Sequence, residues 1–126
     1  MSKTFKPTES ELEILSILWE KESASVRTVH EVVQNTKDVG YTTTLKLMQI
    51  MHEKGLVSRN ESSKTHIYTP LLAKETAQEQ YITKMIKTLF SGNSSQLVLQ
   101  ALGNHQTSQE ELAEIKLLIE QIEKRK

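Results

Sequence analysis

The stretch YTTTLKLMQIMHEKGLV, residues 41–57, decides the fold. Its apolar side chains Leu47, Met48 and Met51 recur at the spacing of a single helical face. They predict a helix over about 43–54 whose inner face is buried. Polar side chains are left for the outer face, which is the side of the helix that a partner could reach.

Both ends of this helix carry residues that helix ends favour. Thr42 can cap the first turn, and Gly55 stands where the last turn needs a left-handed residue. Upstream, a capping box formed by Thr8 and Glu11 and the N-cap candidate Ser25 each begin a further helix. The expected neighbours are helices over 8–22 and from Ser25 to near Thr36, and strands over 56–59 and 66–69. Three helices followed by a hairpin is the order of a winged helix-turn-helix.

The outer face of the 43–54 helix predicts contacts with DNA bases. Reading the major groove needs short hydroxyls and hydrogen-bond donors near a helix N-terminus. Lys46 could reach guanine or a phosphate, and Gln49 could pair with adenine. The simpler interpretation is that the threonines only cap the helix and that Lys46 is an ordinary solvated lysine. The predicted base-reading residues are Thr42, Thr43, Lys46 and Gln49.

The predicted hairpin forms the wing of this fold. Arg59 and Lys64 flank its loop, and we expect them to contact phosphates beside the groove. A charged surface hairpin with no partner is the alternative interpretation.

Residues 71–126 predict three amphipathic helices, with Gly103 ending the second and a capping box at Ser108 and Glu111 beginning the third. A segment this short cannot bury so many apolar faces alone. Pairing with an identical copy would bury them, and a two-fold dimer is the most common solution. The predicted interface residues are Tyr81, Met85, Leu89, Leu112, Ile115, Ile119 and Ile122. The expected architecture is therefore mainly α, with a winged helix-turn-helix DNA-binding domain over 1–70 and a C-terminal helical dimerisation region over 71–126.

The composition excludes several other classes. The 126 residues contain no cysteine, so disulfides, zinc–thiolate sites and thiol catalysis are ruled out. The four histidines are scattered, no phosphate-binding glycine loop occurs, and we expect neither a metal nor another cofactor, and no enzymatic activity. No apolar stretch approaches the roughly 20 residues of a membrane-spanning helix. Met1–Pro7 lacks the apolar segment of a signal peptide, so the expected location is cytoplasmic.

The net charge is zero, which is unusual for a protein that binds nucleic acid. The charge is unevenly distributed, however. Residues 1–36 carry four basic and six acidic side chains, whereas residues 37–64 carry five basic and three acidic ones. The balance becomes positive where a DNA-reading element is predicted.

Together these motifs resemble the penicillinase repressor (BlaI/MecI) family over almost the full length. The similarity lies in TESELEIL with Leu18 and Trp19 in the first helix, in YTTTL followed by EKGLV, and in IYTP at the end of the wing. The resemblance implies homodimeric repressors that bind operator inverted repeats through their winged helices, with the C-terminal helices as the dimer interface. The family's base-reading positions correspond to Thr42, Thr43 and Lys46, and its wing contacts to residues such as Arg59 and Lys64.

The chain also departs from the family pattern. Lys46 stands where many members have threonine, and Ile50 where they often have arginine, so the operator sequence does not carry over. Antibiotic-responsive members are inactivated by cleavage of an Asn-Phe bond in the short C-terminal helix, which implies a membrane sensor protease or its effector as a partner. The matching bond here is Gln100–Ala101, and the inducing signal therefore does not carry over either.

Two other functions remain open at this point. The chain could be a winged-helix protein-interaction module that does not touch DNA, which the zero net charge favours. It could also be a regulator with a small-molecule pocket between its domains, although the tail looks too small and too apolar for that. A steep salt dependence of duplex binding would separate DNA binding from protein docking, because neutralised phosphates release counterions.

Overall fold

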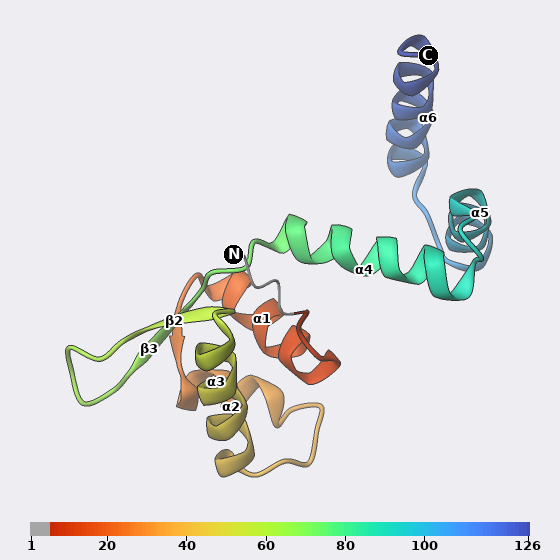
Figure 1. The fold of residues 1–126 in the computed structure, drawn as a ribbon. Helices are drawn as coiled ribbons and strands as arrows, with labels where there is room; N and C mark the ends of the chain where they lie inside the picture. The colour runs from red at the N-terminus through yellow and green to blue at the C-terminus, as the bar shows by residue number, and fades with distance from the viewer. Residues whose placement is uncertain (1–5) are drawn as a thin grey trace. The chain divides into compact units, whose positions relative to one another are not determined.

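The computed structural model describes residues 6–126, which form six helices and one small sheet (Figure 1). The expectation about a signal peptide at Met1–Pro7 falls mostly outside the described residues. The elements in chain order are α1 (Glu9–Lys21), β1 (Ala24–Ser25), α2 (Val26–Val33), α3 (Tyr41–Lys54), β2 (Val57–Asn60), β3 (Ile67–Pro70), α4 (Lys74–Leu89), α5 (Ser94–Asn104) and α6 (Gln109–Lys124).

The chain divides into two compact units, Met1–Tyr81 and Ile82–Lys126, and the boundary lies inside α4. In the first unit, α1, α2 and α3 pack together against the sheet, and the β2–β3 hairpin extends away from the helices (Figure 1). This arrangement is the winged helix predicted from the order of the elements.

The core of the first unit comes from one face of each helix and one face of the sheet. Leu15 and Leu18 of α1, Val29 of α2 and Met48 of α3 are fully buried, as the spacing of apolar residues predicts. Tyr68 of β3 closes the core from the sheet side. Burying side chains of this size contributes about 1.5–3 kcal/mol each, so the core is what holds the three helices in their mutual positions.

The sheet has three antiparallel strands in the order β1-β3-β2. In the register of the sheet, Tyr68 of β3 lies opposite both Ala24 of β1 and Arg59 of β2. Strand β1 was not expected, because residues 23–25 read as a simple break between helices. Two residues are too few to show an alternating pattern, and only pairing with β3 reveals them as a strand.

Most of the predicted helix ends are confirmed. Thr8 and Ser108 each form a capping box with the glutamate three residues later, and Ser25 caps α2 with its hydroxyl. Gly55 ends α3 in the left-handed conformation, with φ of 81°. Where a side-chain oxygen accepts from a free amide of the first turn, a local sequence motif is sufficient to place the helix start.

Two helix ends were predicted wrongly. Thr42 does not cap α3: the helix begins at Tyr41, two residues before the predicted start, and its N-cap is Gly40, which has no side chain to donate or accept. Gly103 does not stop the second tail helix, because α5 continues to Asn104. Glycine is only a weak helix breaker, at about 1 kcal/mol relative to alanine, and its position alone does not end a helix.

Smaller differences concern burial and strand bounds. The helical spacing of Val29, Val32 and Val33 predicts a buried stripe on α2, but Val32 is 37% exposed, and α2 packs through Val26 and Val29 instead. Both hairpin strands begin one residue later than expected. Within residues 6–126, every helix is too short or too polar to cross a lipid bilayer.

Candidate nucleic-acid interface

Helix α3 presents a polar face opposite its buried one. Thr44, Met48 and Met51 face the core and are almost completely inaccessible. The four residues predicted to read bases are all exposed, and the 3.6-residue period places them on the opposite side of the helix. They are Thr42, Thr43, Lys46 and Gln49. The structure therefore brings the predicted base-reading residues together on one accessible surface.

The start of α3 is held against α2 by contacts that the sequence did not indicate. The Nδ1 atom of His30 lies 2.9 Å from the hydroxyl of Thr44, within hydrogen-bond distance. The ring of His30 also meets that of Tyr41 edge-on, with their centroids 5.6 Å apart. The sequence alone assigns no role to His30, one of four scattered histidines. Its two contacts position the first turn of α3, where the base-reading threonines lie.

The hairpin carries both residues that are predicted to contact phosphates, but only one of them is paired with another side chain of the hairpin. Lys64 is exposed in the loop between β2 and β3. Arg59, near the end of β2, instead forms an ion pair with Glu61: its Nε donates to one carboxylate oxygen at 2.6 Å, and its Nη2 lies 2.6 Å from the same oxygen. The same pairing lowers the pKa of Glu61, because the guanidinium of Arg59 favours the charged carboxylate.

A buried ion pair joins the first and third helices. Glu11 is only 2% exposed, and the Nζ of Lys54 lies 2.9 Å from each of its carboxylate oxygens. One of these oxygens also accepts the backbone amide of Thr8 in the capping box. The sequence identified Glu11 as a capping residue only. Its pairing with the last residue of α3 fixes the end of the predicted recognition helix.

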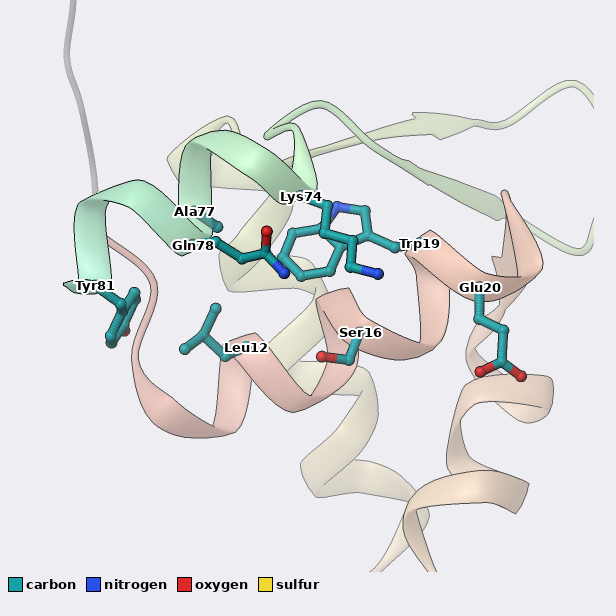
Figure 2. A pocket seen from close by; sticks show the side chains of 8 residues that line it. All are labelled: Leu12, Ser16, Trp19, Glu20, Lys74, Ala77, Gln78 and Tyr81. Carbon is teal, nitrogen blue, oxygen red and sulfur yellow. The ribbon is translucent and has the colours of Figure 1, made fainter. Parts of the chain in front are cut away.

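A groove lies between α1 and the first half of α4, with a volume of about 600 Å³ (Figure 2). Its walls include Trp19 and Tyr81, and both aromatic side chains already have hydrogen-bond partners. The indole Nε1 of Trp19 donates to the carbonyl of Leu72 at 2.9 Å, and the hydroxyl of Tyr81 donates to the carbonyl of Pro7. Burial and the nearby carboxylate of Glu11 raise the pKa of Tyr81, which keeps this donor protonated. These contacts hold the segment from Leu72 to Tyr81 in place within the first unit.

The residues predicted to form the dimer interface are divided between the two units. Tyr81 is the last residue of the first unit and is engaged with Pro7, whereas the others lie in the second unit. There Leu89 is 73% exposed and Ile119 is 48% exposed. In α5 and α6, both fully described, no residue is buried. The candidate cleavage residues Gln100 and Ala101 are exposed within α5.

No group of three metal-ligating side chains occurs among residues 6–126.

Three helices and a hairpin sheet around one core, with a polar face on the third helix, define a winged-helix protein. A solved structure described as the DNA-binding domain of the repressor BlaI has the same fold, with a TM-score of 0.53 at 20% identity. The match covers 60% of this chain and 93% of that domain.

The sequence comparisons then give the family. The family model described as "Penicillinase repressor" matches residues 7–121, and the chain belongs to this family. It is 25% identical to the methicillin resistance regulatory protein MecI of Staphylococcus aureus strain N315, over 94% of this chain and 96% of that protein. It is 23% identical to the penicillinase repressor of Bacillus licheniformis, over 100% of this chain and 98% of that protein. Family membership indicates a DNA-binding transcriptional repressor of the BlaI/MecI type, a class of regulators and not of enzymes.

Proposed function

We propose that the protein represses transcription as a homodimer that binds an inverted repeat in an operator, with α3 of each protomer in the major groove. The observation that carries this proposal is the exposed polar face of α3, set opposite a face that is fully committed to the core. A recognition helix needs this division, because its inner face must be fixed before its outer face can read bases.

Within this interface, each group has a chemical role. The hydroxyls of Thr42 and Thr43 lie in the first turn of α3, where they can accept from or donate to base edges and phosphates. Lys46 can donate to the acceptors of guanine, and Gln49 can form two hydrogen bonds with adenine. On the wing, Lys64 and Arg59 would contact phosphates, which position the protein without reading sequence.

The second unit supports dimer formation because it has no core of its own. Its helices expose large apolar side chains and bury none within the protomer. A second copy would cover this surface, and closed two-fold pairing is the usual way in which identical chains do so. Two winged helices held at a fixed spacing would then match the two halves of an inverted repeat. The proposed interface residues are Met85, Leu89, Leu112, Ile115, Ile119 and Ile122, with Tyr81 at the boundary.

Relief of repression by proteolysis is the remaining part of the proposal. Gln100 and Ala101 correspond to the bond that is cut in antibiotic-responsive relatives, and both are exposed. Cleavage there would separate α6 from the rest of the tail and remove four of the six proposed interface residues. The protease would be a membrane sensor or an effector that it activates.

Selection of bound duplexes from a random library, followed by sedimentation of the complex, tests this function. We expect an enriched inverted repeat, two protomers per duplex, and an affinity that falls steeply with salt. Enrichment of a single half-site would contradict the dimeric reading. Absence of salt-dependent duplex binding would instead favour the protein-interaction module that the zero net charge allows.

A further inference from the structure

The wing holds a cation and an anion in direct contact at the place where a phosphate is expected to bind. Arg59 is part of β2, and Glu61 begins the loop that follows this strand. Nε of the guanidinium donates to one carboxylate oxygen of Glu61 at 2.6 Å, and Nη2 lies 2.6 Å from the same oxygen. This is the edge that arginine uses for paired hydrogen bonds to carboxylates and phosphates. In this structure the protein's own carboxylate occupies it.

The surroundings of the pair determine which partner is fixed. The side chain of Arg59 is 21% exposed and that of Glu61 is 50% exposed. In the sheet, Arg59 lies opposite Tyr68, which is buried and fixed by the core. Arg59 is therefore the more enclosed partner, whereas Glu61 stands on the loop side and is more open to solvent.

We propose that Glu61 is a specificity-determining residue, which occupies the guanidinium of Arg59 and thereby weakens binding to DNA of any sequence. This inference rests on the proposed function. A phosphate must displace the carboxylate before it can use the same donors, and the carboxylate competes at the high effective concentration of a group two residues away. Phosphate contacts supply most of the sequence-independent affinity. Fewer phosphate contacts therefore raise the ratio of operator affinity to non-specific affinity. This ratio determines how well the operator is occupied when many other DNA sites compete for the protein.

The test uses the full-length protein and the variant Glu61→Gln, which keeps the size of the side chain and removes its charge. Binding to a scrambled duplex is measured over a range of salt concentrations, alongside binding to the selected operator. One additional phosphate contact should raise the salt slope by about 0.9, which corresponds to roughly eightfold tighter binding at 0.1 M salt. We expect this gain on scrambled DNA, with a smaller gain on operator.

Two further variants separate occupation of Arg59 from simple charge repulsion. In an Arg59→Ala background, Glu61→Gln should have little further effect, because the competed guanidinium is gone. Glu79→Gln makes the same charge change at an exposed position of α4 and should leave the slope unchanged. Circular dichroism checks that each variant is folded.

The outcomes are distinct. If Glu61→Gln leaves the slope of the wild-type background unchanged, or if it tightens binding equally without Arg59, the proposal is overturned while the proposed function stands. If the wild-type protein binds no duplex at all, the proposed function fails and this inference fails with it.

Discussion

Lys54, the last residue of α3, places its ammonium 2.9 Å from both carboxylate oxygens of Glu11, in the first turn of α1. Glu11 is 2% exposed, whereas the side chain of Lys54 is 27% exposed. The two members of the pair therefore differ in how well they tolerate the loss of their partner.

We predict that Lys54→Ala destabilises the fold more than Glu11→Gln does. Removing the lysine leaves a buried carboxylate without its counter-ion, which should cost about 3 kcal/mol or more. Glu11→Gln retains an oxygen for the amide of Thr8, and the freed lysine can reach water, so the loss should be closer to 1–2 kcal/mol. Urea denaturation of both variants measures the difference. Equal losses, or a larger one for Glu11→Gln, would show that burial of the carboxylate does not dominate.

On the recognition face, Thr43→Ala and Lys46→Ala should weaken operator binding and leave the fold unchanged. Each good base contact contributes about 1–3 kcal/mol of discrimination, and both side chains are exposed with no role in the core. Fluorescence anisotropy on operator and scrambled duplexes measures the ratio. Lys21→Ala, which removes an exposed lysine at the end of α1, is the matched control. The assignment of α3 is wrong if both variants keep the wild-type preference for operator.

In the wing, Lys64→Ala should weaken binding to all sequences equally and reduce the salt slope by about one unit. The lysine is exposed in the hairpin loop, where it can reach a phosphate but is not held against a base edge. Arg59→Ala should give a smaller reduction, because its guanidinium is already paired with Glu61. Titrations at several salt concentrations provide the slopes. A loss confined to one base position would mean that the wing reads sequence.

We expect the DNA-binding unit to extend to Tyr81, where the first compact unit ends. A fragment of residues 1–81 should be folded and monomeric. It should bind operator more weakly than the whole chain by orders of magnitude, because the winged helix of a second protomer no longer binds the other half-site at high effective concentration. A 1–70 fragment should be less stable than 1–81, since it lacks the carbonyl that Trp19 contacts and the hydroxyl of Tyr81. Sedimentation and thermal unfolding compare the three chains. A monomeric full-length protein, or a fragment that binds as tightly as the whole, would refute this role of the tail.

The stability of the first unit should depend on pH through Tyr81, in the half of α4 that belongs to this unit. Its pKa is raised in the folded state, so its contribution to stability is complete below the ordinary tyrosine pKa of about 10 and is lost as the pH rises above that value. Tyr81→Phe should remove the bond to Pro7, at about 1 kcal/mol, together with this alkaline loss. Thermal unfolding between pH 7 and pH 11 tests both effects. An unchanged alkaline profile in the variant would assign that loss to other groups.

The sequence predicted the features that depend on local patterns. The spacing of Leu15, Leu18 and Met48 follows from helix geometry, and it was sufficient to place the helices and their buried faces. The features that were missed depend on residues far apart in the chain. Lys54 and Glu11 are 43 positions apart, and each alone resembles an ordinary charged residue at a helix end.

In the predicted site, exposure on α3 could be predicted because burial of one face determines the other. The pairing of Arg59 with Glu61 could not, although the two are neighbours in sequence, because charged surface residues have many alternative partners. A basic residue two positions from an acidic one at a strand end was the only available signal, and such pairs are common on surfaces.

The absence of any buried residue in α5 and α6 has a consequence for the amount of protein a cell must contain. If these helices gain their core only from a second copy, folding of the tail and assembly of the dimer are one equilibrium, governed by mass action. The melting temperature would then rise with protein concentration. Newly made chains would present an uncovered tail until enough of them accumulate, and repression would begin only above a threshold abundance.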